Sequence, residues 1–241
     1  MNSLFGIVKI LCEDFIMTNG YKNRGAIEII IILNILMFIP YVIYYIFRID
    51  YPFILASYFL NLNVNSPGGF LSFNDGSFWQ ILTAMFMHGN IGHIVFNMYG
   101  LYIFGKPLEV RWGKTKFILF YLVTGVLANL GSALIFIFTG SPLSLLGASG
   151  ALYAVLLAFG GYYPDTKLLL FFFIPLKVKW AILIFTAVEL GLQFSNLNTG
   201  IGHLTHLLGF LFGFIYLTAV HKINPIQKMF FRREEDDYII R

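Results

Sequence analysis

The stretch Gly147-Ala148-Ser149-Gly150 leads into an apolar run that continues through residues 151–161. A serine hydroxyl in the first turn of a hydrophobic helix, flanked by glycines that allow close backbone approach, can act as a nucleophile when a base is nearby. Serine and glycine are also common where membrane helices pack against each other. The stretch therefore indicates catalysis only if another part of the chain supplies the base.

His206 is the candidate base, because it lies in a later apolar run within the pattern His206-x-x-Gly209-x-x-x-Gly213. Glycines four residues apart allow two membrane helices to pack backbone to backbone, which would bring the imidazole within reach of Ser149. An ionisable side chain inside a membrane span is costly and requires a partner. We therefore expect a catalytic Ser149–His206 dyad in which His206 acts first as general base and then as general acid.

Composition indicates the class of protein. Hydrophobic residues make up 58% of the chain and charged residues 12%, with a mean hydropathy of +0.77. Soluble globular domains average roughly 25% charged residues, so this is the composition of an integral membrane protein. The net charge of +4 is small and the basic residues are dispersed, which argues against nucleic-acid binding. Cys12 is the only cysteine, which excludes an intramolecular disulfide and a multi-cysteine metal site.

The apolar runs predict an all-α membrane protein, with a six-transmembrane-helix bundle over residues 27–220. Residues 48–90 contain only apolar pieces of about eight residues, too short to cross roughly 30 Å of hydrocarbon. They are expected to form a long, partly membrane-embedded first loop. Residues 1–26 are expected to be a cytoplasmic segment with an interfacial helix, and residues 221–241 a cytoplasmic tail. The predicted membrane helices are residues 27–47, 91–104, 117–138, 149–163, 180–194 and 201–220.

Shorter features interrupt this pattern. Pro40 is expected to kink the first helix. Residues 105–116 are rich in charge and are predicted to form a cytoplasmic loop, which Glu109 and Arg111 would brace. Residues 168–174 are apolar but are followed by Pro175, so we expect an interfacial segment there.

The distribution of basic residues predicts the orientation. Fifteen of the sixteen Lys and Arg residues fall in the two termini and in the loops after the second and fourth helices, and only Arg48 falls on the other side. Because cytoplasmic loops carry an excess of Lys and Arg, both termini are expected in the cytoplasm, in a bacterial-type cell membrane. The second, fourth and sixth helices would then all run inward from the outer face.

This orientation predicts that several polar side chains share one depth. His93, Asn97, Ser149 and His206 all fall within about the first two turns of inward-running helices, which corresponds to the outer third of the bilayer. His93 and Asn97 are four residues apart and face the same way, so with the Ser149 N–H they would form an oxyanion hole. Hydrogen bonding between helices is the alternative role for this pair. Tyr153, one turn below Ser149, would support the imidazole or simply pack.

A carboxylate is not expected in this layer. Glu189 is the only acid well inside a predicted helix, but it lies near the middle of that helix and is assigned a buried structural contact. His203 is assigned to a helix cap or interface. A dyad without a third acidic member is therefore the hypothesis.

Taken together, these motifs resemble the rhomboid intramembrane serine proteases. The resemblance covers about residues 79–216 and implies endoproteolysis of single-span membrane proteins without a cofactor or a metal. It implies Ser149 and His206 as the dyad and Tyr153 beneath His206. It also implies His93 and Asn97, supported by Gly147, as oxyanion contributors. The matching motifs are His88-Gly89-Asn90-Ile91-Gly92-His93-Ile94-Val95-Phe96-Asn97, Glu109-Val110-Arg111, Gly147-Ala148-Ser149-Gly150-Ala151-Leu152-Tyr153 and the His206 pattern.

The chain departs from the family pattern at two positions. The usual Trp-Arg pair of the first loop is Trp79-Gln80, and the alanine common before the histidine is Thr205. The first change puts the anchoring of the loop in doubt, and the second adds a hydroxyl near the dyad. Neither removes a group that the chemistry requires.

Other functions remain open on the residues alone. A catalytically inactive rhomboid-like protein that binds membrane helices would share the same motifs. A metalloenzyme could use His88, His93, His203 and His206 as ligands, whereas a transporter is disfavoured by the absence of repeated broken helices. The expected partners are the lipid bilayer and single-span membrane proteins, not nucleic acid, and the sequence does not specify an oligomeric state.

Overall fold

The structure is a computed structural model that describes residues 25–65, 72–170, 174–195 and 202–231. Helices dominate these residues, and two short two-stranded sheets join them. The interfacial helix predicted within residues 1–26 and the last ten residues of the predicted tail lie outside the described ranges.

The first predicted span forms two helices, α2 (Ala26–Met37) and α3 (Ile39–Phe47), which meet at Phe38. Pro40 lies in the first turn of α3, where its missing N–H needs no partner. The expected interruption therefore falls just before Pro40. The chain then turns at Arg48, which has a left-handed backbone conformation, into α4 (Asp50–Leu60).

The long first loop is folded and has its own small core. After α4 it contains β1 (Leu62–Val64), a 3₁₀ turn η1 (Phe73–Asp75), α5 (Gln80–Thr83) and a second 3₁₀ turn η2 (Ala84–Phe86). Strand β1 pairs in antiparallel register with β2 (Leu143–Leu145), which precedes the Ser149 stretch. The loop is thereby joined to the segment that leads into Ser149. The buried residues of this core are Leu62, Val64, Phe73, Ala84, Ala133 and Leu145.

The second predicted helix begins as expected but continues further. Helix α6 (Ile91–Gly100) runs through a π-helical turn η3 (Leu101–Gly105) into α7 (Lys106–Trp112). The prediction of a charged loop over residues 105–116 is therefore wrong. The charged side chains are paired, because Lys106 Nζ lies 2.5 Å from Glu28 of α2 and 3.2 Å from Glu109 of α7. Gly113, with a φ of +82°, ends α7.

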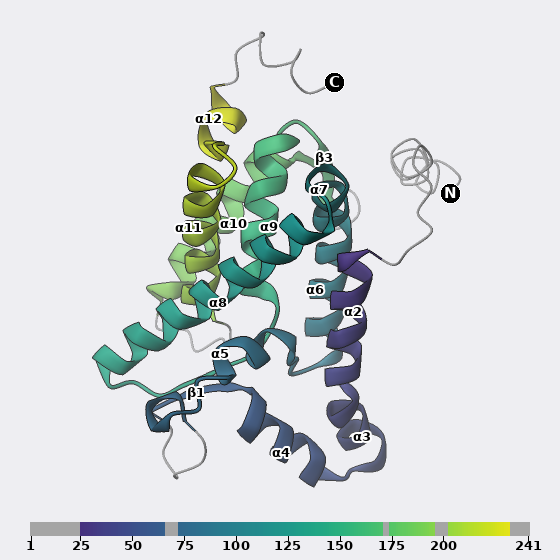
Figure 1. The fold of residues 1–241 in the computed structure, drawn as a ribbon, viewed down its shortest axis with the longest axis vertical. Coiled ribbons are helices and arrows are strands. Elements are labelled where there is room, and N and C mark those ends of the chain that lie inside the picture. The colour runs from purple at the N-terminus through teal and green to yellow at the C-terminus, as the bar shows by residue number, and fades with distance from the viewer. Residues whose placement is uncertain (1–24, 66–71, 171–173, 196–201, 232–241) are drawn as a thin grey trace.

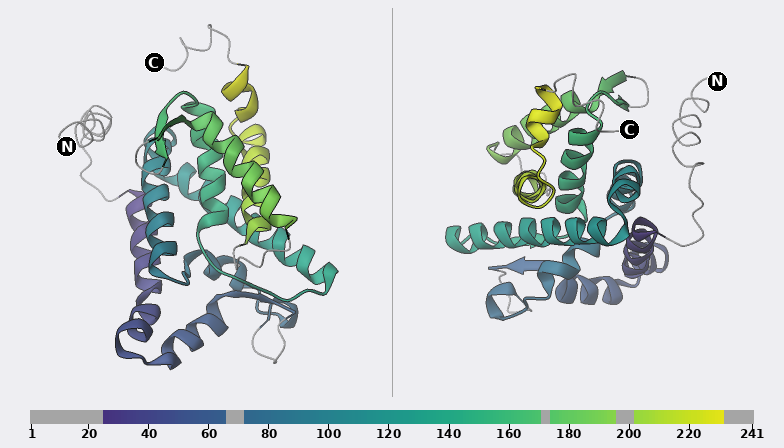
Figure 2. Two further views of the ribbon diagram at one scale, coloured as in Figure 1. Left: turned by 180° about the vertical axis from the view of Figure 1, so that it is seen from behind. Right: turned by 45° about the horizontal axis from the view of Figure 1, so that its top comes forward.

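Four helices form the centre of the protein: α8 (Lys114–Thr139), α9 (Ser149–Tyr162), α10 (Val178–Gln193) and α11 (His203–Ala219). Helix α8 packs on α9 and α11 on one side and on α5 and β1 on the other. The right-hand view of Figure 2 shows α8, in teal, lying between these two groups. Each of the six predicted helical segments thus contains a helix, with ends that differ by a few residues from the prediction and a second segment that continues into α7, and the number of membrane crossings stays a prediction.

The described residues of the segment predicted as interfacial lie in two short strands, and their position relative to the membrane stays a prediction. Strands β3 (Lys167–Leu170) and β4 (Ile174–Lys177) pair in antiparallel register. After α11, a short helix α12 (Pro225–Phe230) packs against α9, where Met229 is buried. Part of the segment assigned to the tail therefore lies on the helical core. Figure 1 shows α12 and β3 at one end of the molecule and α4, α5 and β1 at the other.

Length and surface chemistry agree with a membrane protein. The helical stretches Ala26–Phe47 and Lys114–Thr139 are long and apolar enough to cross a bilayer, and α9 and α11 are shorter apolar helices. Large apolar side chains are exposed along these elements, including Leu36 on α2 and Phe138 at the end of α8, which is 85% exposed. Such surfaces are expected where lipid, and not water, surrounds the protein.

Candidate active site

Helices α9 and α11 meet through their small residues. A Cβ placed on Gly209 would overlap the carbonyl oxygen of Gly150, and a Cβ on Gly213 would lie 2.9 Å from the Ala154 Cα. The two backbones are therefore as close as glycine alone permits, as the His206 pattern predicted. Because Ser149 precedes Gly150 and His206 lies one turn before Gly209, the contact places both side chains at the same level.

Ser149 and His206 are in hydrogen-bond contact. The Ser149 Oγ lies 2.7 Å from the His206 Nε2. Ser149 is the first residue of α9, so its backbone N–H has no partner within the helix. The hydroxyl is partly exposed whereas His206 is buried. This arrangement joins a nucleophile, a base and a free helix N–H at one point.

Tyr153 lies against the face of His206, where the resemblance placed it. The two rings are stacked, with centroids 4.4 Å apart and planes inclined by 8°. Phe210 contacts the Tyr153 ring edge-on at 4.9 Å. The imidazole plane is therefore held by aromatic packing that comes from both α9 and α11.

A carboxylate does reach this layer, contrary to the expectation from sequence. Glu189 Oε1 lies 2.9 Å from His206 Nδ1, and Glu189 Oε2 lies 2.5 Å from His203 Nδ1. Glu189 is in the penultimate turn of α10, and His203 and His206 are in the first turns of α11. These helices are consecutive and meet at the end where α10 stops and α11 starts. Glu189 reaches the layer of Ser149 and His206 because it lies close to the end of α10 that meets α11. The sequence pattern placed it near the middle of the helix, below this layer.

One of the predicted oxyanion contributors, His93, lies beside Gly147. A Cβ on this residue, whose φ is +124°, would lie 2.7 Å from His93 Nε2 and 3.7 Å from Ser149 Oγ. Glycine thus makes room for the His93 ring beside the serine. The Gly147 N–H donates to the Ala84 carbonyl at 2.8 Å, so its contribution is to position the chain. Asn97 is buried, and its Nδ2 donates to the His93 carbonyl at 2.9 Å.

Both departures from the family pattern have structural partners. Gln80 is fully buried, accepts a hydrogen bond from the Asn63 N–H and donates one to the Tyr58 carbonyl. It therefore connects α5 to α4 and β1. Thr205 and Ser132 of α8 share a hydrogen bond of 2.6 Å between their hydroxyl groups, so the added hydroxyl next to His206 is satisfied.

One cluster in the described part of the chain has the ligand types and spacing of a metal site. The candidate ligand atoms of Glu189, His203 and His206 all lie within 4.8 Å of one another. The same atoms already form hydrogen bonds among themselves, so the cluster satisfies its polar groups without an ion. His88 and His93, which a four-histidine site would need, contact each other edge to face, with ring centroids 4.8 Å apart, and are not members of this cluster.

The fold and the site together define a helical membrane protein with a serine–histidine pair between two closely packed helices. The family model described as Rhomboid domain matches residues 75–223, which is more than half of the chain, and the chain belongs to the rhomboid family. Membership of this family implies a membrane protein, in agreement with the composition.

Several named relatives share this region. Rhomboid protease GluP of Bacillus subtilis is 30% identical over 137 residues, which cover 57% of this chain and 25% of the relative. RHOMBOID-like protein 6, mitochondrial, of Arabidopsis thaliana is 34% identical over 145 residues, covering 58% and 44%. Presenilin-associated rhomboid-like protein, mitochondrial, of Homo sapiens is 32% identical over 151 residues, covering 59% and 38%. The aligned region spans less than half of each of these relatives.

Proposed function

We propose that this protein is an intramembrane serine endopeptidase that hydrolyses peptide bonds in or near the transmembrane segments of single-span membrane proteins. The observation that carries the proposal is the 2.7 Å approach of Ser149 Oγ to His206 Nε2. Membership of the rhomboid family supports the same reaction class. The reaction then proceeds in steps that use only groups of this chain and water.

In the first step, Ser149 Oγ attacks the carbonyl carbon of the scissile bond while its proton passes to His206 Nε2. The carbonyl oxygen becomes an oxyanion, and we expect it to accept a hydrogen bond from the Ser149 N–H, which has no partner within α9 because Ser149 is the first residue of that helix. The His93 ring lies beside Ser149, in the space that the missing side chain of Gly147 leaves, and supplies a ring N–H. Asn97 has two amide protons, and one remains for the oxyanion after the contact to the His93 carbonyl.

In the second step, the C–N bond breaks and His206 gives its proton to the departing amine. The product is an acyl-enzyme in which Ser149 Oγ is bonded to the carbonyl carbon. Water then attacks this ester with His206 again as base, and the breakdown of the second tetrahedral intermediate returns the proton to Ser149. His206 thus takes up one proton and releases one proton in each half of the reaction, and the enzyme returns to its starting state.

The substrate must present an accessible peptide bond. Inside a membrane helix every backbone group is hydrogen-bonded, so the scissile bond is shielded until the helix unwinds locally. Glycine or proline near the cleavage site would lower this cost by about 1 or 3 kcal/mol per residue relative to alanine. We expect cleavage at sites near the outer end of substrate helices that contain such residues.

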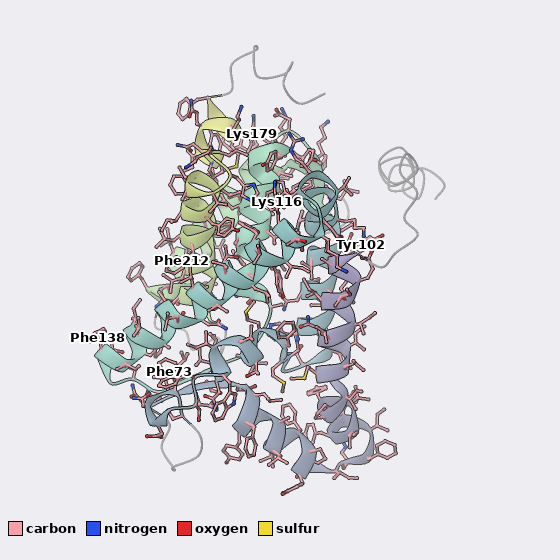
Figure 3. All side chains as sticks on the ribbon, in the orientation of Figure 1. Phe73, Tyr102, Lys116, Phe138, Lys179 and Phe212 are labelled. Carbon is pink, nitrogen blue, oxygen red and sulfur yellow. The ribbon has the colours of Figure 1, made fainter. Side chains whose placement is uncertain are left out.

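The orientation is part of the proposal. Lys116 and Lys179 lie toward the α12 end of the protein, and Phe73 and Phe138 lie toward the β1 end (Figure 3). The positive-inside rule then places the α12 end and both termini in the cytoplasm. Ser149 begins a helix that runs away from the β1 end (Figure 1), and this direction supports a proposed site in the outer half of the membrane.

A second candidate is a catalytically inactive rhomboid-like protein that binds membrane helices without cutting them. The relatives include proteins whose names say rhomboid-like without naming a protease. For this candidate, replacement of Ser149 would leave the function unchanged.

The test uses purified protein in lipid vesicles with a panel of single-span membrane substrates. We expect cleavage by the wild type, resistant to chelators, and none by Ser149→Ala or His206→Ala. Ser141→Ala, which alters an exposed serine just before the site, is the matched control and should cleave normally. Mass spectrometry of the products locates the bond. Equal cleavage by the wild type and Ser149→Ala, or by neither, would refute the proposal.

A further inference from the structure

Glu189 occupies a position that packing alone does not explain. It is a carboxylate in the interior of the helical core with 7% of its surface exposed. Burying an ionised carboxylate costs several kcal/mol unless hydrogen bonds replace the lost water. An apolar residue of similar volume would fill the same space without that cost. The groups that the carboxylate contacts must therefore explain why it is buried at this position.

Those groups are a hydroxyl that donates and two imidazole nitrogens that can donate, and all three converge on one carboxylate. His206 Nδ1 lies 2.9 Å from Oε1, and His203 Nδ1 lies 2.5 Å from Oε2. The hydroxyl of Tyr153 donates a short hydrogen bond to Oε1. Both oxygens are thus used as acceptors, which is the pattern of an ionised carboxylate.

The contact with His206 determines which ring nitrogen carries the proton. An ionised carboxylate only accepts hydrogen bonds, so His206 Nδ1 carries the hydrogen in the neutral ring. The lone pair is then on Nε2, which faces Ser149 Oγ at 2.7 Å. This is the tautomer that can accept the serine proton. When the ring becomes an imidazolium during the reaction, the same carboxylate lies beside the positive charge.

Tyr153 links this contact to the stacking of the imidazole. Its ring lies parallel to His206 at 4.4 Å, while its hydroxyl reaches Glu189. The histidine is consequently held on its face by Tyr153 and at its edge by Glu189. The three side chains come from α9, α10 and α11, so their arrangement depends on how these helices pack.

We propose that Glu189 is a positioning residue that holds His206 in the tautomer and orientation needed to act as base, so that the site works as a Ser149–His206–Glu189 triad. This goes beyond the two-residue dyad that the family resemblance implies, and it rests on the proposed protease function. His203 and Tyr153 complete the hydrogen bonds of the carboxylate and keep it directed at His206. No bond to the substrate is made or broken by Glu189.

The first variant is Glu189→Gln, which keeps the shape but removes the charge. Its amide has one accepting and one donating end, so it cannot accept from all three donors, and its NH₂ group favours the wrong tautomer of His206. We expect kcat to fall by about 10²- to 10⁴-fold, with KM unchanged, by comparison with carboxylate loss in serine proteases. Thr186→Val, one turn away on α10, is the matched control and should keep the wild-type kcat.

The second variant, Glu189→Asp, restores the carboxylate on a shorter side chain. We expect its kcat to lie between those of the wild type and Glu189→Gln, which is the rescue that a purely structural role would not produce. If Glu189→Gln does not fold, Glu189→Asp carries the test alone, with a reduced kcat at unchanged KM as the expected result. Thermal unfolding of every variant in detergent identifies losses caused by misfolding.

A spectroscopic readout tests the positioning directly. In protein with ¹⁵N-labelled histidine, the signal absent from His206→Ala is assigned to His206, and its nitrogen shifts report the tautomer. We expect Nδ1–H in the wild type and a shift toward Nε2–H in Glu189→Gln. This measurement needs no cleavage, so it tests the positioning even if the proposed protease function fails.

The outcomes separate the two proposals. A wild type that cleaves, with an inactive Ser149→Ala and a fully active Glu189→Gln, would overturn the positioning role and leave the protease function standing. A raised KM with unchanged kcat in Glu189→Gln would assign Glu189 to substrate binding, and this result would also overturn the positioning role. An unchanged His206 tautomer in Glu189→Gln would do the same without reference to activity.

Discussion

Gly209 of α11 packs directly on the carbonyl oxygen of Gly150 in α9, with no room for a methyl group between the two helices. The neighbouring pair repeats the contact one turn further, where a Cβ on Gly213 would lie 2.9 Å from the Ala154 Cα. The proposed reacting groups, Ser149 and His206, lie at the end of this contact. The distance between the two helices therefore sets the distance between the two side chains.

Gly209→Ala is predicted to separate α9 from α11. Overpacking of a close contact costs about 1–3 kcal/mol, and a displacement of about 1 Å at a reacting group can reduce the rate about 10²-fold. We expect a lower thermal midpoint and a loss of cleavage of at least that size. Gly191→Ala on α10 is the control, because no atom lies within 4 Å of its Cβ position. An active Gly209→Ala with normal stability would contradict this role of the contact.

Gly147→Ala is predicted to disturb the site through His93. The substitution combines a backbone φ of +124° with a Cβ 2.7 Å from the His93 Nε2. Gly140→Ala has a positive φ of +69° but open space around its Cβ, so it reports backbone strain alone. We expect each to cost about 1–2 kcal/mol of stability from strain, measured by thermal unfolding. Cleavage should be lost only in Gly147→Ala, and equal activity of the two variants would refute the role of this space.

Gln80→Ala is predicted to loosen the first loop. Its loss leaves the buried Asn63 N–H and Tyr58 carbonyl without this partner, and such groups cost about 1–3 kcal/mol each. We expect reduced stability and increased proteolysis within residues 58–63. Asn74→Ala, which removes two exposed hydrogen bonds with Asn65 and a long one from the Ser72 hydroxyl, should change stability by less than about 0.5 kcal/mol. If both variants were equally stable, Gln80 would not anchor the loop.

The ion pairs of Asp165, which precedes β3, are predicted to make the stability of the folded protein weakly dependent on pH. Asp165 lies 2.9 Å from Lys177 Nζ and 3.0 Å from Lys179 Nζ, and hydrogen bonds from these groups lower its pKa. A lowered pKa in the folded state stabilises the protein above the unfolded value of about 3.9, and the effect is lost as the pH falls through the folded value. Because the Asp165 side chain is 54% exposed, screening keeps the effect small.

The measurement compares thermal midpoints of the wild type and Asp165→Asn. We expect a small difference at neutral pH that shrinks as the pH is lowered from about 4 and as salt is added. A difference that grows toward low pH would mean that the ionised Asp165 side chain destabilises the folded protein, and the two lysine contacts would then not be stabilising.

Much of the helical arrangement could be predicted from the sequence. Runs of apolar residues locate helices because hydrophobicity is a local property that adds up over about 20 residues. The glycine pattern after His206 predicted a close helix contact, which the structure contains. The extension of α6 through α7 was missed because charges suggested a loop, whereas Lys106 and Glu109 are paired within the fold.

The sequence by itself indicated the membrane character, six helical segments and the candidate residues Ser149 and His206, since composition is local and the glycine pattern after His206 is a spacing within one helix. Only the tertiary structure decided that Glu189 reaches His206, because that contact depends on where two helices cross and on which end of α10 faces the site. The same holds for the fit of His93 beside Gly147. Distances between side chains on different helices are set by packing, which no spacing along a single chain encodes.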